Sequence, residues 1–198
     1  MNEHYFTQKP TSQYALKKVK ARVLGNGFIF NTVSGVFSFG RIDAGSLLLV
    51  ENAIIKEGWD ILDVGCGWGF VGIVIKKQFP HSNVMMTEIN ERAIQIAKKN
   101  AKLNKTDVTV LQSNLFESIQ GQFDSILVNP PMKAGRELCY QIIEQSKSHL
   151  KKDGLLQLVA LHNRGGSMLE KKMKEVFRNV ETITKKGGFR VYVSAKAL

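Results

Sequence analysis

Short apolar runs alternate with longer segments of helical character from Trp59 onwards, and this alternation predicts the fold. The runs are almost continuously apolar, as is typical of strands that are buried on both faces of a parallel sheet. The expected strands are DILDVG (60–65), NVMMTE (83–88), DVTVLQ (107–112), FDSILV (123–128) and GLLQLVAL (154–161). We therefore predict an α/β domain with a doubly wound, mostly parallel sheet that is covered by helices.

The end of the chain departs from this alternation. After an expected helix over 167–177, the segments VETITKK (180–186) and FRVYVSA (189–195) are separated by Gly187 and Gly188. Two glycines between two such runs are typical of a tight hairpin turn. We expect a terminal antiparallel hairpin, which brings the sheet to seven strands.

Residues 1–57 precede the alternation and, in our interpretation, form an N-terminal extension of hairpin and helix. This extension is expected to pack on a core domain of residues 58–198. The polar residues 1–20 are expected to be held loosely.

Two elements are predicted within this extension. The stretch GFIFNTVSGVFSFG (27–40) predicts a β-hairpin with Ser34 and Gly35 at its turn. Asp43 is a suitable N-cap for a helix that is expected to reach Glu57.

Charge is spread unevenly along the chain. The 198 residues carry a net charge of +11, and the pI is about 9.7. Residues 1–57 have 7 Lys or Arg against 4 Asp or Glu, residues 58–145 have 9 of each, and residues 146–198 have 12 against 4. We expect an anionic partner, and nucleic acid is favoured over a membrane surface at this pI.

Cysteine usage and hydropathy indicate the compartment. Cys66 and Cys139 lie far apart and form no C-x-x-C, so neither a disulfide framework nor a zinc site is predicted. Two free thiols fit a reducing cytosol. The N-terminus lacks the apolar core of a signal peptide, and the longest apolar run (46–55) is broken by Glu51 and Asn52. We expect a cytoplasmic protein with no membrane span and no metal, as a monomer or weak dimer.

A glycine-rich loop follows the first expected strand. LDVGCGWGFVG (62–72) places Gly65, Gly67 and Gly69 where a helix begins, so that the backbone can approach a ligand closely. From Gly67 the same letters spell G-x-G-x-x-G, the dinucleotide fingerprint. By itself the loop fits an NAD enzyme, a binder of another adenosine cofactor, or a tight turn between a strand and a helix.

Polar residues also follow the second and third expected strands. Glu88 can accept hydrogen bonds from both ribose hydroxyls of an adenosine, or it can act as an acidic N-cap of the next helix, although Asn90 can also fill that role. Asn114 lies near the expected adenine, or it is an ordinary loop residue.

The fourth expected strand ends at Asn129, Pro130 and Pro131. These residues distinguish an NAD enzyme from a methyltransferase. A dehydrogenase needs no rigid oxygen acceptors here, whereas methyl transfer to a planar amine does. The amine attacks only if its nitrogen moves toward tetrahedral geometry. The Asn129 side-chain oxygen and the Pro130 carbonyl would hold that geometry and stabilise the developing positive charge. The prolines fix φ, so the carbonyl stays aimed. A strand that simply ends on prolines is the alternative.

These motifs carry a resemblance to a known family. The order and spacing of DVGCGWG, Glu88 and NPPM resemble those of class I S-adenosylmethionine-dependent methyltransferases. GVFSFGRIDAGSLLL (35–49) resembles the small-domain family that includes the 16S ribosomal RNA guanine-N2 methyltransferases. NPPMKAGRE (129–137) is similar to the single-domain archaeal-type members. The resemblance extends from about Gly35 to KKGGFRV (185–191), and it implies a Rossmann-like methyltransferase with S-adenosylmethionine as cofactor.

The resemblance implies a role for each matching residue. The cofactor-binding positions are, by this match, Asp63, Gly65, Gly67, Gly69, Glu88 and Asn114. Asn114 stands where many relatives have an aspartate that faces the adenine amine. Asn129 and Pro130 match the catalytic pair.

Pro131 and Met132 are expected to lie against the target base. Many amino methyltransferases have Phe or Tyr at the position of Met132, where the ring stacks on the flipped base, and methionine offers a softer, polarizable contact. A stacking ring would then come from Trp68, Phe37 or Phe39.

A base within RNA must be splayed out to reach such a pocket, and the surrounding protein must bind phosphates. The candidate phosphate contacts are Lys133, Arg136, Arg164 and Arg190. KKVKAR (17–22) is a further candidate basic arm. We expect ribosomal RNA or a small ribosomal subunit as the partner.

Our first hypothesis is methylation of guanine N2 in small-subunit ribosomal RNA. Protein glutamine N5 methylation uses a similar Asn-Pro-Pro, usually followed by tyrosine, so Met132 and the basic C-terminal third argue against it. DNA adenine methylation is a further alternative, but this chain has no extra recognition domain to read a DNA sequence. A non-catalytic RNA-binding or assembly factor would not need the glycine loop or Asn129. An NAD-dependent oxidoreductase leaves the two prolines unexplained.

Overall fold

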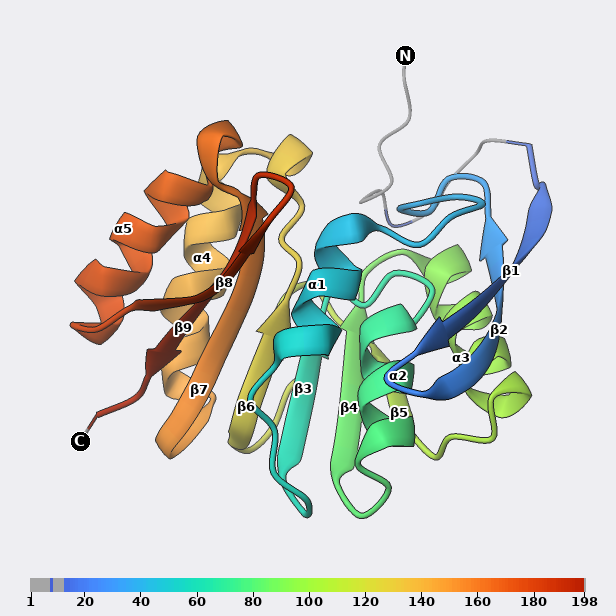
Figure 1. Ribbon diagram of the computed structural model, residues 1–198, viewed down its shortest axis with the longest axis horizontal. Coiled ribbons are helices and arrows are strands. Elements are labelled where there is room, and N and C mark those ends of the chain that lie inside the picture. Colours follow the sequence, from blue (N-terminus) through green and yellow to red (C-terminus); the bar gives the residue numbers. More distant parts are fainter. Residues whose placement is uncertain (1–7, 9–12, 198) are drawn as a thin grey trace.

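The computed structural model describes residue 8 and residues 13–197, and a seven-stranded sheet runs through its centre (Figure 1). The strand order is β5-β4-β3-β6-β7-β9-β8. The strands are β3 (Asp60–Val64), β4 (Asn83–Glu88), β5 (Thr109–Gln112), β6 (Phe123–Val128), β7 (Leu150–Leu161), β8 (Glu181–Lys186) and β9 (Phe189–Ala195). Neighbouring strands from β5 to β7 are parallel, and β9 is antiparallel to both of its neighbours. The predicted doubly wound α/β class with a terminal antiparallel hairpin is confirmed.

Helices cover both faces of this sheet. They are α1 (Ala44–Asn52), α2 (Phe70–Gln78), α3 (Glu91–Leu103), α4 (Arg136–Ser148) and α5 (Gly166–Phe177), with the short 3₁₀ helices η1 (Met132–Ala134) and η2 (His162–Arg164). Successive residues of a strand point to opposite faces. Ile61 and Leu127 accordingly pack in the core beneath α1, α2 and α3, whereas Leu62 and Val128 pack in the core beneath α4 and α5. This double burial explains why the strands are almost continuously apolar.

The N-terminal hairpin exists, but the predicted partner strand was wrong. β1 (Leu16–Val23) pairs with β2 (Asn26–Val33), and the two-residue turn between them has Leu24 at φ 48° and Gly25 at φ 79°. Two positive φ values define the type I′ turn that suits a two-stranded hairpin. Part of the segment 1–20, expected to be loosely held, therefore belongs to β1.

The segment 34–40, expected as the second strand, forms turns instead. Beyond Ser34, whose N–H donates to the Ala15 carbonyl at 3.0 Å, side chains bond several of its backbone groups. The Trp68 Nε1–H donates to the Phe37 carbonyl at 2.9 Å, and the Gly40 N–H donates to Thr32 Oγ1 at 2.8 Å. These bonds replace a strand ladder, and they hold the segment above the carboxyl ends of the sheet.

Asn100 of α3 and Asn104, the C-cap of that helix, close the outer edge of β2. The Asn100 side chain accepts from the Asn31 N–H at 2.8 Å and donates to the Asn31 carbonyl at 2.9 Å. The Asn104 side chain does the same for Ile29, at 3.1 and 2.9 Å. Residues four apart lie on the same side of a helix, so the pair matches alternate residues of the strand. The hairpin is thus fixed to α3 by four hydrogen bonds.

Helix α1 begins as predicted and ends earlier than predicted. The Asp43 Oδ2 atom accepts from the Ser46 N–H at 2.8 Å, which confirms Asp43 as N-cap. The helix stops at Asn52 rather than near Glu57 because the Gln157 side chain on β7 binds both the N–H (2.8 Å) and the carbonyl (2.7 Å) of Ile54. A bond pattern of this kind holds Ile54 in an extended chain.

The β1–β2 hairpin, α1 and the sheet share one apolar core. Phe30 of β2, Leu49 of α1 and Ile61 of β3 belong to the same buried cluster. The boundary that we propose between an extension (1–57) and a core domain (58–198) therefore separates parts that are packed together.

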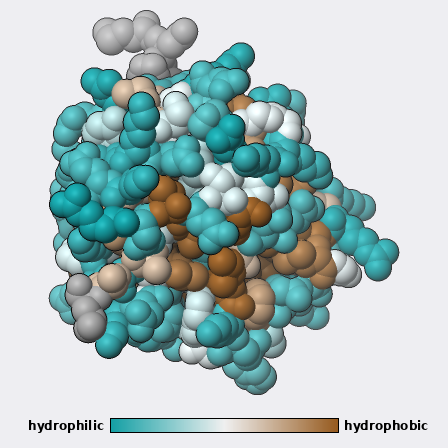
Figure 2. All heavy atoms as spheres, turned by 60° about the vertical axis from the view of Figure 1, so that its left-hand side comes forward, coloured by the Kyte–Doolittle hydropathy of each residue, from teal (hydrophilic) through white to brown (hydrophobic). Residues whose placement is uncertain are grey.

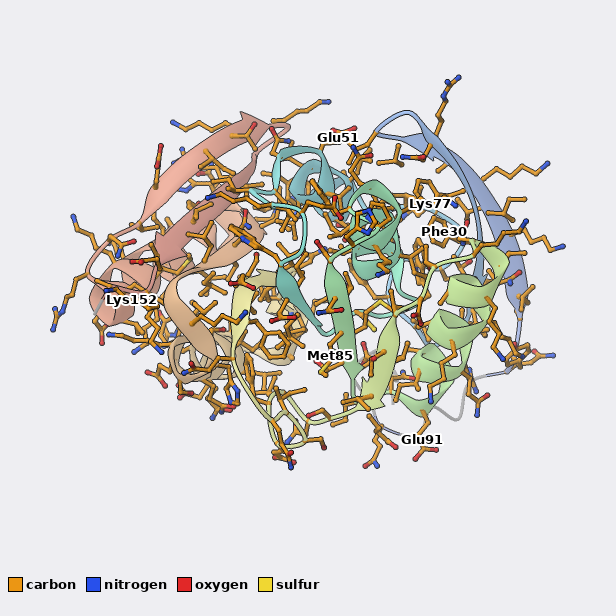
Figure 3. The ribbon with its side chains drawn as sticks, turned by 90° about the horizontal axis from the view of Figure 1, so that it is seen from below. Phe30, Glu51, Lys77, Met85, Glu91 and Lys152 are labelled. Carbon is orange, nitrogen blue, oxygen red and sulfur yellow. The ribbon has the colours of Figure 1, made fainter. Side chains whose placement is uncertain are left out.

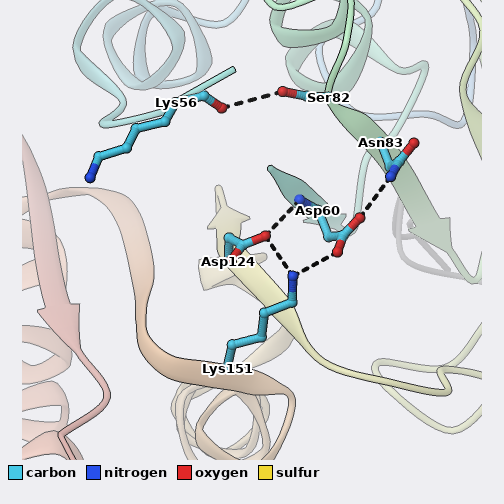
Figure 4. A network of polar contacts seen from close by, with 6 residues as sticks. All are labelled: Lys56, Asp60, Ser82, Asn83, Asp124 and Lys151. Carbon is cyan, nitrogen blue, oxygen red and sulfur yellow. Dashed lines mark hydrogen bonds and ion pairs between the residues drawn. The ribbon is translucent and has the colours of Figure 1, made fainter. Parts of the chain in front are cut away.

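A polar network joins β3, β4, β6 and β7 at their amino ends (Figure 4). Lys151 Nζ lies 2.7 Å from Asp60 Oδ2 and 2.8 Å from Asp124 Oδ2. Asn83 Nδ2 donates to Asp60 Oδ1 at 2.8 Å. The hydrogen bonds from Lys151 and then from Asn83 hold the pKa of Asp60 below its ordinary value. This network stabilises the edge of the sheet that lies away from the carboxyl ends.

Apolar surface gathers on the side of the molecule that carries the terminal hairpin (Figure 2). A groove between α1 and the β8–β9 turn is lined by Leu47, Leu48 and Phe189, with Glu51 and Lys186 beside them. No helix in the described part of the chain has the length and apolar character needed to cross a membrane. No group of three or more His, Cys, Asp or Glu side chains within the same residues is arranged to hold a metal ion.

Candidate active site

A cleft of about 840 Å³, open solvent at its mouth included, lies at the carboxyl ends of the parallel strands. The chain builds the sheet from β3 outward to β5 and then returns to β6 on the other side of β3. The cleft lies at this topological switch point, where doubly wound sheets bind their ligands. Its walls include Gly65 after β3, Glu88 at the end of β4, Asn114 after β5 and Asn129 after β6.

Two glycines of the loop after β3 face the cleft directly. Gly65 and Gly67 have φ values of 70° and 56°, and a Cβ added to either would meet no atom within 4 Å. Their backbone therefore borders open space that a ligand can fill, as an adenosine cofactor requires. Gly69 differs, because a Cβ there would lie 3.0 Å from Ile73 and 3.2 Å from Ala97. Gly69 allows α2 and α3 to approach each other and does not line the cleft.

Asp63, a predicted cofactor residue, lies beneath the loop and not in the cleft wall. Its side chain is 3% exposed, and its Oδ2 atom accepts from the Gly72 N–H at 2.9 Å. Burial raises the pKa of Asp63 to about 7; the bond from Gly72 opposes this rise and the nearby Glu88 carboxylate adds to it. Asp63 thus fixes the course of the loop into α2.

Glu88 is held in place by three backbone N–H groups. Its Oε2 atom accepts from Gly67 at 2.9 Å, and its Oε1 atom accepts from Ile89 at 2.8 Å and Asn90 at 3.0 Å. Burial raises the pKa of Glu88, while these three bonds oppose the rise. A carboxylate has about four acceptor positions, so one remains for a ligand hydroxyl. Glu88 is suited to bind a ribose edge.

The loop after β5 forms the far wall of the cleft. Asn114 lines the cleft, and its Nδ2 atom donates to Glu117 Oε1 at 2.7 Å. This bond leaves Oδ1 as the acceptor that can meet an amine. Leu115 and Ile89, on either side, supply apolar contact for a flat ring.

Asn129 is oriented by residues at the start of α1. Its Nδ2 atom donates to Asp43 Oδ2 at 2.9 Å and to Ser46 Oγ at 2.8 Å. Both amide hydrogens are therefore used on the α1 side, and Oδ1 is left as the atom available to the cleft that Asn129 lines. Asp43 and Ser46 were missed as site residues from sequence, where Asp43 served as an N-cap only. They lie 86 and 83 residues from Asn129, so no local pattern connects them.

The two prolines form a tight turn whose carbonyl is fixed. The Met132 N–H donates to the Pro130 carbonyl at 2.8 Å, and Pro131 has φ −76° and ψ 74°, which is an inverse γ-turn. A carbonyl oxygen accepts two hydrogen bonds, so Pro130 keeps one acceptor position. Pro130 and Pro131 both line the cleft beside Asn129.

Met132, by contrast, turns away from the cleft. Its Sδ atom lies 3.9 Å from Cys139 Sγ, and its Cε atom lies against Gly165, where an added Cβ would overlap it. Of the three rings considered as substitutes, Phe37 lines the cleft, while Trp68 is buried and Phe39 lies under the Lys17 ammonium group. Of these three rings, Phe37 is therefore the one that borders the cleft.

The predicted phosphate contacts stand around the cleft and not in its wall. Lys133 and Arg136 are exposed in and just after η1, and the Arg136 guanidinium lies 5.9 Å from the Tyr140 ring centre. Arg164 is exposed in η2, and Arg190 pairs with Ala160 near the carboxyl end of β7. All four cations lie toward the edge of the sheet at which the cleft opens.

Comparison with known proteins agrees with this geometry. Residues 27–193 match the family model described as "Methyltransferase small domain". The chain is 36% identical over 202 residues to the uncharacterized protein YbxB of Bacillus subtilis, covering 99% of this chain and all of YbxB. It is 33% identical over 165 residues to ribosomal RNA small subunit methyltransferase C of Haemophilus influenzae, and spans about half of that protein (49%).

A solved structure shows the same fold. It is the T. thermophilus 16S rRNA N2 G1207 methyltransferase (RsmC) in complex with AdoMet and guanosine, with a TM-score of 0.80 at 23% identity, covering 94% of this chain and 52% of that one. S-adenosylmethionine, the cofactor predicted from the sequence, agrees with the family match and with the open glycine loop beside Glu88. The chain belongs to the small-domain family of S-adenosylmethionine-dependent methyltransferases.

Proposed function

We propose that this protein methylates the exocyclic N2 amino group of guanine in small-subunit ribosomal RNA. The observation that carries the proposal is the orientation of Asn129, whose amide hydrogens are both bound by Asp43 and Ser46. Its Oδ1 atom and the Pro130 carbonyl then offer two acceptors at one end of the cleft. Two acceptors match the two hydrogens of an exocyclic amine.

The chain's residues would act mainly by orientation. When bound, S-adenosylmethionine supplies an electrophilic methyl group. Asn129 Oδ1 and the Pro130 carbonyl would accept the two N–H groups, so that the nitrogen lone pair points at the methyl carbon. They would also stabilise the positive charge that develops on nitrogen, an effect worth about 10²–10³ in rate for one such oriented group. The proton can pass to water after transfer, so no general base is required.

The remaining walls would place the two ligands. Glu88 would accept from a ribose hydroxyl, and Asn114 from the adenine amine, with the methionine end of the cofactor against Gly65 and Gly67. Phe37 would offer its ring to the flipped base. The choice of guanine N2 is supported by the activity of the T. thermophilus relative, and the choice of ribosomal RNA by that relative and the H. influenzae relative.

Labelled methyl transfer tests this proposal. The protein would be incubated with methyl-labelled S-adenosylmethionine and, in separate arms, unmethylated small-subunit ribosomal RNA and small ribosomal subunits. The digested RNA would be analysed by mass spectrometry. We expect label in N2-methylguanosine with the wild-type protein and none with Asn129→Ala. Cofactor binding without any labelled RNA in either arm would refute the proposal and would direct attention to protein glutamine.

A further inference from the structure

We propose that the outer side of the β1–β2 hairpin is a docking surface for the phosphate backbone of RNA, continuous with the rim of the active-site cleft. This surface, called the hairpin face below, comprises Lys18, Lys20 and Arg22. The inference rests on the proposed function, because the strand bound there would be the one whose base enters the cleft.

The hairpin face is cationic, and within the described part of the chain no acidic side chain pairs with it. From Gln13 to Ile42 the sequence contains five Lys or Arg and no Asp or Glu. Lys18, Lys20 and Arg22 are exposed, and none of them forms an ion pair with an acidic side chain among the residues that the structure describes. These cations are therefore available to phosphate groups.

The three cations form a row that leads to the cleft. Alternate residues of a strand share one side and lie about 7 Å apart, so the row spans about 13 Å. Its Lys18 end lies at the open end of the hairpin, toward Val33, and only two residues separate Val33 from Val36 in the cleft wall. Figure 1 shows the hairpin beside α3, on the opposite side of the molecule from the terminal hairpin β8–β9.

The same residues also present backbone donors. Lys20 and Lys18 are the partners of Ile29 and Asn31 across the hairpin. Because the N–H groups of Ile29 and Asn31 point outward to Asn104 and Asn100, those of their partners point outward along the free edge of β1. Backbone N–H groups bind phosphate oxygens as side chains do, so each position of the row offers two donors.

The hairpin is held firmly enough to act as a platform. Its inner side carries Phe28 and Phe30, at 3% and 0% exposure, and the Phe30 ring lies 5.1 Å from that of Trp68. Its β2 edge is bonded to α3. Binding to such a preformed surface costs little conformational entropy. Lysines on a free strand edge also discourage pairing with other chains, so the row needs a test that separates the two roles.

The test compares two triple variants that lose the same charge. The hairpin variant is Lys18→Gln/Lys20→Gln/Arg22→Gln, and the control is Lys152→Gln/Lys171→Gln/Lys174→Gln, all exposed. Figure 3 shows Lys152 at the opposite end of the molecule from Phe30. Binding of unmethylated small-subunit ribosomal RNA would be measured at several salt concentrations, alongside S-adenosylmethionine affinity and the unfolding midpoint.

We expect the hairpin variant to lose at least tenfold in RNA affinity and the control less than threefold, with cofactor affinity and unfolding unchanged in both. The slope of log affinity against log salt should fall by about 2 for the hairpin variant, since each phosphate contact on a single strand contributes about 0.7. Equal losses in the two variants, or none in either, would overturn the docking proposal even if the wild type methylates RNA. Hairpin-dependent binding without any methyl transfer would support the docking surface and reject the proposed function.

Discussion

Replacing Asp43 with alanine is expected to slow methyl transfer without weakening cofactor binding. The substitution removes one of the two acceptors of the Asn129 amide, at 2.9 Å, and leaves Ser46 Oγ at 2.8 Å. A hydrogen bond to a charged group is worth about 1.5–3 kcal/mol. If all of that energy serves to orient the amide, kcat falls by about 10- to 150-fold, because about 1.4 kcal/mol corresponds to a factor of ten.

The same substitution also removes a helix cap, and this effect must be separated from the first. Asp43 Oδ2 accepts from the Ser46 N–H, so alanine is expected to cost about 1 kcal/mol of stability. Urea unfolding measures this loss directly. Asp43→Asn keeps an oxygen acceptor at both bonds and should give an intermediate kcat.

A double-mutant cycle decides whether Asp43 acts through Asn129. Single-turnover methyl transfer would be measured at saturating RNA and cofactor for Asp43→Ala, Asn129→Ala and the double variant. If Asp43 only positions Asn129, it has no further effect once Asn129 is gone. A kcat within twofold of wild type for Asp43→Ala, or a further tenfold loss in the Asn129→Ala background, would refute the positioning role.

Three further outcomes are expected. The pKa of Asp63 is raised from 3.8 to about 7, so the folded protein keeps this group protonated where the unfolded chain ionises, and stability is lost as pH rises from about 4 to about 7. Asp63→Asn should remove that loss of stability, which amounts to at most about 4 kcal/mol. Urea unfolding at a series of pH values measures it, and an unfolding free energy that falls with pH as much in the variant as in the wild type would contradict the prediction. Gly65→Ala should raise the dissociation constant for S-adenosylmethionine at least tenfold in calorimetry, because its Cβ would point into the cleft. Gly25→Ala is the control, because Gly25 in the hairpin turn has a similarly positive φ and the substitution carries similar strain. It should leave the dissociation constant for S-adenosylmethionine unchanged. Asn100→Ala strips buried backbone groups of their partners and should lower the unfolding free energy by about 2–4 kcal/mol, against under about 0.5 kcal/mol for the exposed Gln95→Ala.

The elements of the core could be predicted because the central strands β3 and β6 are buried on both faces. FDSILV and FRVYVSA coincide with β6 and β9, and the other core strands begin and end within a few residues of the predicted positions. A continuous apolar run bounded by Gly, Pro or Asn leaves little choice of conformation. The strand ends then locate the cleft, and Glu88 and Asn129 line it as expected.

The missed features depend on contacts between distant parts of the chain. β2 pairs with β1 through a turn in which Leu24 adopts a left-handed conformation. Leucine rarely adopts this conformation, so the sequence does not indicate a turn there. The end of α1 depends on Gln157, 103 residues from Ile54. Met132 turns toward Cys139 because Gly165 leaves room for its methyl group, and no pattern around Met132 reveals this.

The bonds from Asp43 and Ser46 to Asn129 determine which part of the chain can be transferred as one unit. The strand–helix alternation begins at Trp59, yet the groups that orient the Asn129 amide come from the N-cap and first turn of α1, which lies before it. A fragment trimmed to residues 58–198 would retain the glycine loop, Glu88 and Asn129, but its amide would be free to rotate. The family model, which starts at residue 27, includes α1. In gene fusions or domain exchanges within this family, the transferable unit therefore has to begin upstream of α1.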